Sequence, residues 1–237
     1  MSKYKRILFK VSGESLMGDN AFGHSAEAIH KISTEIAKIH KQGIQVCLVV
    51  GGGNIFRGVS VSTELMDRTS ADYMGMLATI MNGIALQSSL EKHGVPTRML
   101  SALSVNKVCE PYIRRRAIRH LNKNRALIFV AGTGNPFFTT DTASVLRASE
   151  MDCEVMLKGT QVDGVYSKDP KKFPNAVRYN SISFDRAIQE NLKVVDPTAL
   201  TLARDNNMPI VIFKISEKDA LLNAINGKGK FTVIDKK

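Results

Sequence analysis

Three glycine-rich turns, each directly after an apolar run, contain the residues of this chain that are best placed to do chemistry. Ser-Gly-Glu follows Val11, Gly-Gly-Gly-Asn follows Val50, and Ala-Gly-Thr-Gly-Asn follows Val130. Glycine lets the backbone approach a ligand closely, and the free N–H groups at the start of a helix attract anions. One such turn is commonly only a tight connection, whereas three of them indicate a site for phosphate groups.

Cationic and capping side chains accompany these turns. Lys10 and Lys158 stand at the ends of apolar runs, and Arg57 follows the second turn. Residues 139–141, Thr-Thr-Asp, are candidate N-caps of a helix that follows the third turn. Because cations and helix N-termini both stabilise negative charge, this combination favours binding of a polyphosphate.

The most familiar phosphate-binding signatures are missing from the sequence. It contains no Gly-x-x-x-x-Gly-Lys-Ser/Thr, no complete Gly-x-Gly-x-x-Gly after a strand, and neither His-Arg-Asp nor Asp-Phe-Gly. These absences argue against a P-loop enzyme, a Rossmann dehydrogenase and a protein kinase.

An alternation of apolar strands and amphipathic helices must position the turns. The predicted strands are 6–11, 44–50, 95–100, 126–130, 153–157, 209–213 and 231–234, and the predicted helices are 25–41, 71–93, 114–125, one ending at 150, 196–206 and 218–226. Residues 12–24 are predicted to be a loop. Repeated alternation indicates an α/β fold with a mainly parallel sheet covered by helices on both faces. Ligands in such folds bind beyond the carboxyl ends of the strands, where the turns lie.

Composition sets the broad class of the protein. The 237 residues are 43% hydrophobic and 23% charged, which suits one large domain or two small joined ones. No apolar run approaches the roughly 20 residues that cross a bilayer, and we expect no membrane partner and a cytoplasmic location. The cysteines Cys47, Cys109 and Cys153 are expected to be buried free thiols, and the histidines have no metal-ligand spacing.

A net charge of +11 indicates anionic partners, and the densest basic run is 114–125. Its cations recur at helical spacing opposite a row of apolar residues, which predicts the solvated face of a surface helix. The cations are Arg115, Arg119 and Lys123, and the apolar residues are Ile113, Ala117 and Leu121. Nucleic-acid binding by this helix is the alternative, but no recognised nucleic-acid motif supports it.

Five segments together resemble the bacterial uridylate kinases of the amino-acid kinase superfamily. They are 9–14 (FKVSGE), 51–58 (GGGNIFRG), 72–79 (DYMGMLAT), 131–143 (AGTGNPFFTTDTA) and 158–166 (KGTQVDGVY). The likeness extends over nearly the whole chain, and Gly-Thr-Gly-Asn-Pro-Phe-Phe-Thr-Thr-Asp is specific to the uridylate kinase branch. It implies a three-layer αβα sandwich around a mainly parallel central sheet, as a single amino-acid kinase domain, 1–237. An acceptor lobe of about 1–150 and an ATP lobe of about 151–237 are expected within it.

The resemblance implies transfer of the ATP γ-phosphoryl group to UMP, giving UDP and ADP. Lys10 and Lys158 would stabilise the transferring group, and Asp141 would orient both lysines and favour their charged form. The implied ATP-binding residues are Lys10, Val11, Ser12, Gly13, Gly53, Arg57, Thr160, Tyr166 and Asp169. Magnesium would arrive with the ATP phosphates; its protein ligands are not implied, and Asp163 and Asp196 are candidate helpers.

The implied UMP-binding residues are Gly52, Arg57, Asp72, Thr133, Gly134, Asn135, Pro136, Phe137, Phe138, Thr139 and Thr140. Among them, Asp72 would take the ribose hydroxyls. The base would be read near Thr133 and Asn135, because an amide carries both the donor and the acceptor that a uracil edge requires. The phosphate would lie near Gly52, Arg57 and residues 139–140.

The resemblance also implies assembly and regulation. Members form a homohexamer, a trimer of dimers, and the predicted helix 71–93 is the candidate dimer contact, with its apolar residues in the core or at an interface. UTP is an expected inhibitor that competes for the UMP site. Arg98 and Arg125 match the family's GTP effector pattern, but Gln87 and Glu91 depart from it. We therefore expect weak or absent activation by GTP.

Two alternative functions remain open on the sequence. One is another small-molecule kinase of the superfamily, acting on carbamate, glutamate or aspartate. The other is a non-catalytic nucleotide sensor or a basic nucleic-acid-binding regulator, for which the 114–125 run is the only positive sign. The presence of Lys10, Asp141 and Lys158 argues against a protein that has lost catalysis.

Overall fold

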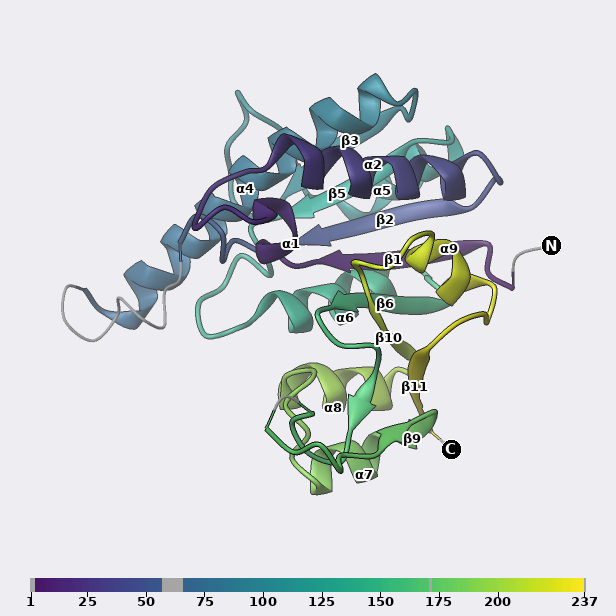
Figure 1. The fold of residues 1–237 in the computed structure, drawn as a ribbon. Helices are drawn as coiled ribbons and strands as arrows, with labels where there is room; N and C mark the ends of the chain where they lie inside the picture. The colour runs from purple at the N-terminus through teal and green to yellow at the C-terminus, as the bar shows by residue number, and fades with distance from the viewer. Residues whose placement is uncertain (1–2, 57–65, 171, 237) are drawn as a thin grey trace.

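A computed structural model describes residues 3–56, 66–170 and 172–236 (Figure 1). Its main sheet has the strand order β4-β3-β5-β2-β1-β6-β10-β11-β9, and β7 pairs with β8 apart from it. The strands are β1 (Arg6–Val11), β2 (Gln45–Val50), β3 (Thr97–Ser101), β4 (Glu110–Pro111), β5 (Ala126–Val130), β6 (Val155–Thr160), β7 (Val165–Tyr166), β8 (Arg178–Tyr179), β9 (Ser181–Ser183), β10 (Ile210–Lys214) and β11 (Phe231–Asp235). Within the main sheet, β10 and β11 pair antiparallel and the other described pairs are parallel.

Helices cover both faces of the main sheet, which confirms the predicted three-layer arrangement (Figure 1). One layer contains α2 (Ala26–His40), α4 (Arg68–Lys92) and α9 (Ala220–Ile225), with the short α1 (Glu14–Met17) beside α2. The other contains α5 (Arg114–Asn122), α6 (Thr140–Glu150), α7 (Phe184–Gln189) and α8 (Pro197–Asp205). None of the helices described is long and apolar enough to cross a membrane.

The central strands are mainly apolar because both of their faces are buried. In β1, Ile7, Phe9 and Val11 belong to the core beneath α2 and α4, whereas Leu8 belongs to the core beneath α5 and α6. Successive side chains of a strand point to opposite faces, so one run supplies both cores. Lys10 follows the Leu8 side and therefore faces α6.

Helix α4 is partly buried and partly exposed, because only one of its faces packs on the sheet. It begins at Arg68, three residues before the predicted start, since Asp67 caps it by accepting a hydrogen bond from the Ser70 N–H at 3.0 Å. Met76 and Ile80 are buried. The opposite face exposes a row of large apolar side chains: Tyr73, Met74, Leu77, Met81 and Ile84.

Several predicted boundaries and elements differ from the structure. The predicted loop 12–24 contains α1, and the segment 158–195 contains β7, β8, β9 and α7, which no periodicity indicated. Strand β6 begins two residues later than predicted. Ile113 is 46% exposed as the residue before α5, so its expected place in the apolar row is wrong, whereas Ala117 and Leu121 are buried.

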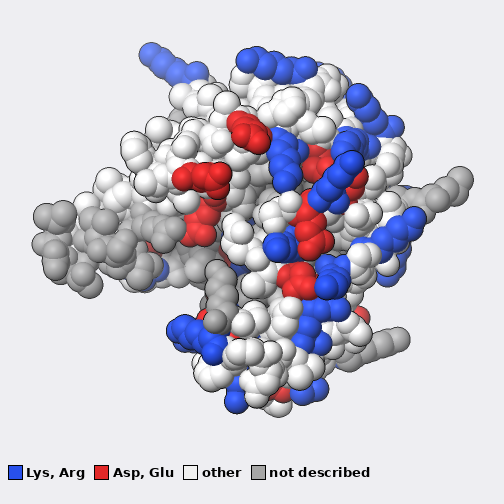
Figure 2. Space-filling model, in the orientation of Figure 1, with Lys and Arg blue, Asp and Glu red and all other residues white. Residues whose placement is uncertain are grey.

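The cysteines are free in this structure, as predicted, although Cys109 is only partly buried. Figure 2 shows acidic and basic side chains interspersed on the face that it presents, so on that face the net charge is not gathered into one basic patch.

Candidate active site

The parallel sheet brings the glycine turns together at the carboxyl ends of neighbouring strands. The first two turns are in contact, because the Gly51 N–H donates to the Val11 carbonyl at 2.9 Å. A Cβ on Gly51 would lie 3.1 Å from the Gly13 nitrogen, so any larger residue would have to displace the first turn slightly. Lys10 in β1 and Lys158 in β6 are paired in register, and paired residues of adjacent strands point to the same face. Both lysines therefore face α6.

Asp141, in the first turn of α6, lies between the two lysines. Its Oδ1 is 3.2 Å from Lys10 Nζ, and its Oδ2 is 2.5 Å from Lys158 Nζ. Lys158 Nζ also donates to the Val194 carbonyl at 2.7 Å. Lys10 and Asp141 are each 8% exposed, so this Lys–Asp–Lys cluster is nearly removed from water.

The charges within the cluster compete with burial. Burial disfavours the carboxylate, but the ammonium groups of Lys10 and Lys158 outweigh it and hold the pKa of Asp141 below its ordinary value. Burial lowers the pKa of Lys158, and the attraction of Asp141 opposes this only in part, because Lys10 repels a second positive charge. The predicted effect of Asp141 on Lys158 is therefore present, but it does not raise that pKa above the ordinary value.

The third turn leads directly into α6. Thr139, among the three candidates, is its N-cap: Thr139 Oγ1 accepts from the Asp141 N–H at 3.1 Å and from the Thr142 N–H at 3.3 Å. Ala131, Gly132, Gly134 and Phe137 all have positive φ. Only glycine adopts such φ values without strain, so the turn has a specific, partly strained backbone.

A cavity of about 150 Å³ lies where the second and third turns face α4. Six of the predicted UMP residues line it: Gly52, Asp72, Thr133, Phe138, Thr139 and Thr140. Gly53, predicted for ATP, also lines this cavity. Gly134, Asn135, Pro136 and Phe137 are not among its lining residues, and Arg57 lies outside the described residues.

Asp72 is held in place by protein partners. The Arg68 Nε is 2.9 Å from each of its carboxylate oxygens, and the Phe137 N–H donates to its Oδ2 at 2.7 Å. The Arg68 guanidinium also lies 5.8 Å from the centre of the Phe137 ring. Asp72 therefore joins α4 to the third turn. Sequence reasoning missed this role of Arg68, although an Arg four residues before an Asp in a helix is a recognisable pair.

A second cavity, of about 430 Å³, adjoins the cluster at Val194. The predicted ATP residues Tyr166 and Asp169 line it together with Val194, the residue that accepts from Lys158. Thr160 does not line it; its hydroxyl donates to the Val162 carbonyl at 2.7 Å. Sequence reasoning missed the wall formed by 190–194.

The two candidate helper carboxylates have protein partners. Asp196 caps α8 and accepts hydrogen bonds from the hydroxyls of Thr139 and Thr142, so it ties α8 to α6. Asp163 Oδ1 accepts from the Tyr166 hydroxyl at 2.6 Å, and this hydrogen bond raises the pKa of Tyr166.

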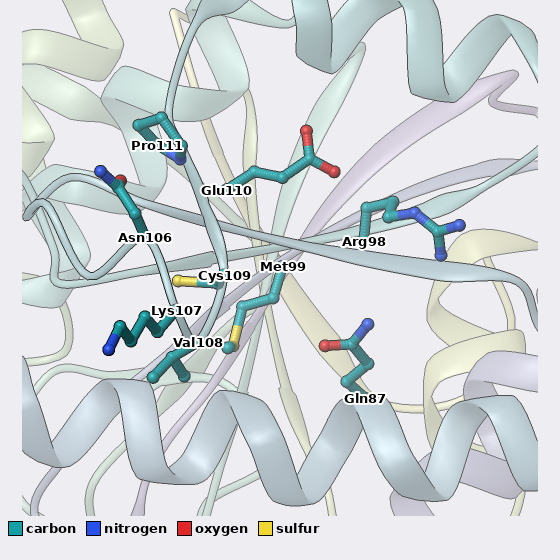
Figure 3. Close-up of a pocket in the computed structure, with 9 residues that line it drawn as sticks. All are labelled: Gln87, Arg98, Met99, Asn106, Lys107, Val108, Cys109, Glu110 and Pro111. Carbon is teal, nitrogen blue, oxygen red and sulfur yellow. The ribbon is translucent and has the colours of Figure 1, made fainter.

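Two residues of the effector pattern, Gln87 and Arg98, line another cavity, of about 480 Å³ (Figure 3). Figure 3 shows Gln87 and Arg98 at one end of this cavity and Asn106 and Lys107 at the other. Gln87 Nε2 is 3.3 Å from Glu91 Oε1, and Arg98 forms a 3.7 Å ion pair with the same carboxylate. Arg125 donates to His120 Nδ1 at 3.0 Å.

The basic helix α5 has a mixed environment. Arg114 is paired with Asp152 at 3.0 Å and Arg116 with Glu110 at 3.7 Å. The predicted stripe of Arg115, Arg119 and Lys123 is exposed. The solvated-face interpretation agrees with this exposure.

Comparisons with known proteins point to one family. The model of the Amino acid kinase family matches residues 5–214. The chain is 56% identical over 232 residues to the uridylate kinase of Wolbachia pipientis wMel, in an alignment that covers 98% of this chain and 94% of that protein. It is 53% identical over 229 residues to the uridylate kinase of Cereibacter sphaeroides, covering 97% and 93%.

Solved structures agree with these sequence relatives. The fold is similar to the UMP kinase from Ureaplasma parvum, with a TM-score of 0.94 and 41% identity over 99% of this chain and 100% of that one. It is equally similar to the UMP kinase from Bacillus anthracis, with a TM-score of 0.94 and 38% identity, covering 99% and 97%.

Proposed function

The chain belongs to the amino acid kinase family, and we propose that it transfers the γ-phosphoryl group of ATP to UMP, giving UDP and ADP. The observation that carries the reaction is the buried Lys–Asp–Lys cluster, which adjoins residues of two cavities. Asp141 follows Thr140, which lines the smaller cavity, and Lys158 contacts Val194, which lines the larger one. The near full-length likeness to uridylate kinases indicates UMP as the acceptor.

The cluster suits phosphoryl transfer because this reaction mainly needs charge stabilisation and positioning. Lys10 and Lys158 would neutralise the charge that develops on the transferring phosphoryl oxygens, and Asp141 would hold both ammonium groups in place. The N–H groups near Ser12 and Gly13 would add donors. No general base is required, because the phosphate acceptor is already an anion.

We assign the 150 Å³ cavity to UMP and the 430 Å³ cavity to ATP. In the first, Gly52, Arg57 and residues 139–140 would bind the acceptor phosphate, and Asp72 the ribose. Thr133 would contact the base, with Asn135 and the rest of 134–138 beside it. In the second cavity, the Tyr166 ring would stack on adenine. The proposed ATP set is completed by Val11, Gly53, Thr160 and Asp169.

Magnesium is the proposed companion of ATP and would neutralise charge on its phosphates. The described residues contain no group of three His, Cys, Asp or Glu side chains that could hold a metal ion. Asp141 Oδ1 is buried and, beyond its ion pair with Lys10, has no hydrogen-bond partner in the described chain. An ion that takes most of its ligands from phosphate and water needs few protein ligands, and the Asp141 carboxylate is already paired with both lysines.

Assembly and regulation follow from the same assignments. We propose that the exposed apolar face of α4 is covered in a homo-oligomer, with a hexamer as the expected form, because large apolar side chains gather there. UTP would inhibit by occupying the acceptor cavity. Activation by GTP is expected to be weak, since Glu91 already pairs with Arg98 and a carboxylate opposes a triphosphate.

Two further predictions concern organisation and location. We propose that 1–150 forms an acceptor lobe and 151–237 an ATP lobe, within one sheet in which β1 pairs with both β2 and β6. A cytoplasmic location, where ATP and UMP are available, is the expected one.

The test is ADP release from magnesium ATP by the purified protein, with UMP, CMP, dUMP, carbamate, glutamate and aspartate offered in parallel. Turnover confined largely to UMP is expected. Turnover on carbamate or an amino acid would overturn the acceptor, and nucleotide binding without turnover would favour the sensor alternative. Lys10→Ala should abolish activity, whereas Lys38→Ala, a matched change at a surface lysine paired with Asp219, should not.

A further inference from the structure

A pair of buried amides joins α4 to the second glycine turn. Asn82 in α4 is completely buried, and Asn54 at the end of the turn is 2% exposed. Asn54 Nδ2 donates to Asn82 Oδ1 at 3.0 Å, and Asn82 Nδ2 donates to Asn54 Oδ1 at 2.7 Å. Neither residue belongs to the catalytic or nucleotide-binding sets discussed above.

Main-chain carbonyls determine the orientation of both amides. Asn82 Nδ2 also donates to the Gly51 carbonyl at 2.6 Å, and Asn54 Nδ2 to the Gly23 carbonyl at 2.7 Å. A carbonyl can only accept, so the atoms that face it are the amide nitrogens. Asn82 Oδ1 lies 2.6 Å from His24 Nε2, which must therefore carry the proton and donate. Every polar atom of Asn82 is thus used, as expected of a rigid buried network.

The network touches both of the turns that meet at the cluster. A Cβ on Gly13 would lie 2.5 Å from Asn54 Oδ1, so the first turn rests directly on this amide. A Cβ on Gly52 would lie 2.7 Å from the Gly75 carbonyl of α4. The first turn, the second turn and α4 are therefore interlocked, and none can shift without disturbing the amide pair.

Helix α4 also contacts the third glycine turn, through Thr79, three residues before Asn82. Thr79 is 2% exposed, and its Oγ1 accepts from the Ala131 N–H at 2.7 Å while it donates to the Met76 carbonyl at 2.7 Å. Asn82 and Thr79 lie three residues apart, on the buried face of α4. This face thus anchors both turns that line the acceptor cavity.

We propose that Asn82 is a positioning residue for phosphoryl transfer to UMP, acting through the Gly51–Asn54 turn and touching no substrate. The acceptor cavity has one wall from α4, including Asp72 and Gly75, and another from Gly52 and Gly53. Asn82 sets the separation of these two walls. The proposal rests on the assignment of this cavity to UMP.

The first variant is Asn82→Asp, which keeps the shape and Oδ1 of the side chain but removes the donors to Gly51 and Asn54. We expect the KM for UMP to rise about tenfold or more, because small displacements of binding groups have large effects. The KM for ATP should rise less than the KM for UMP, because the residues that line the larger cavity do not bond to Asn82, and only Gly13 and Gly53 of the proposed ATP set adjoin the amide pair. Ser33→Ala is the matched control: Ser33 is fully buried in α2, and its hydroxyl has no partner in the described structure.

Asn82→Ala, which brings no buried charge, is the second variant if the aspartate does not fold. A double-mutant cycle with Asn54→Ala tests whether the two amides act as a pair, in which case the double variant should be about as impaired as either single variant. Thermal unfolding is measured for every variant. A lowered Tm with both KM values within about twofold of the parent, or additive effects in the cycle, would overturn the proposal.

Asp72→Asn is measured in parallel to separate the two proposals. A raised KM for UMP in Asp72→Asn but not in the folded Asn82 variants would refute the role of Asn82 while leaving the assignment of the cavity to UMP intact. An unchanged KM for UMP in both would refute the assignment of the cavity to UMP, and the role of Asn82 with it.

Discussion

Replacing Asp141 by Asn is the sharpest test of the proposed catalytic cluster, because it removes one charge and almost no volume. The carboxylate lies 3.2 Å from Lys10 Nζ and 2.5 Å from Lys158 Nζ, with the side chains of all three residues 10–13% exposed. Removing one member of a buried ion pair typically costs about 3–5 kcal/mol of stability, because its partner remains buried without a counter-charge. Here two ammonium groups would be left facing each other.

Loss of a proton from Lys158 would reduce this loss of stability, because it removes one of the two facing positive charges. Burial and the repulsion of Lys10 already lower the pKa of Lys158, and Asp141 opposes them more strongly than Asp196 does, so this pKa falls further in Asp141→Asn. A neutral Lys158 stabilises no developing negative charge. Loss of one such group costs about 2.7–4 kcal/mol, which corresponds to a kcat reduced about 10²–10³-fold.

Two assays distinguish this account from simple misfolding. The kcat of Asp141→Asn, measured at saturating ATP and UMP from pH 6 to pH 9.5, should fall more steeply as pH rises than that of the parent, because Lys158 loses its proton at lower pH. Acid unfolding supplies the second sign. The pKa of Asp141 is lowered from 3.8, so its stabilisation is complete above that value and is lost as pH falls through the lowered pKa; the Asn variant should lack this contribution. A folded variant with a kcat within about threefold of the parent would refute the role of Asp141.

Three other predictions concern ATP, assembly and the effector. Tyr166→Ala should raise the KM for ATP about tenfold through lost stacking. Tyr166→Phe, which loses only the hydroxyl bonded to Asp163, should leave the KM for ATP within about twofold. Equal effects of the two variants would exclude stacking. Met81→Glu, on the exposed face of α4, should reduce the molar mass measured by light scattering. Ala26→Glu, at an exposed position of α2, should not. An unchanged mass in Met81→Glu would place the subunit contact elsewhere. GTP titrated at subsaturating ATP should change the rate by less than about twofold, and strong activation would contradict the expected effect of Glu91.

The central sheet was predictable because its strands are short buried runs between turn signals. β1 and β5 have the predicted bounds, since 6–11 and 126–130 are mainly apolar runs followed by Ser-Gly and Ala-Gly. The segment 158–195 was not predictable, because β7 and β8 have two residues each and depend on distant contacts. Thr232 Oγ1 joins the Val165 N–H to the Tyr179 carbonyl across more than fifty residues, and no local period encodes such a contact.

The Lys–Asp–Lys cluster of the candidate site was predictable from the sequence. The residues that hold its surroundings in place, such as Asn82, were less so. The types and strand-end positions of Lys10 and Lys158 indicated phosphate chemistry, and the resemblance identified Asp141. Asn82 was missed because it interrupts an apolar helical pattern and was passed over as an ordinary helix residue. The available signal was its spacing from Thr79 and Leu86, which puts a polar side chain on a buried face, where it must have a partner.

The electrostatics of the cluster suggest when its cations are most effective. Without substrates, burial lowers the pKa of Lys158, and a single carboxylate serves two ammonium groups. Phosphate groups entering the two proposed cavities bring further negative charge toward the same cations, and nearby negative charge favours the protonated amine. Lys158 is therefore most firmly protonated when both nucleotides are bound, which is the state in which transfer must be stabilised. Two buried lysines that share one carboxylate are thus stabilised in their charged form more by the site with nucleotides bound than by the empty site.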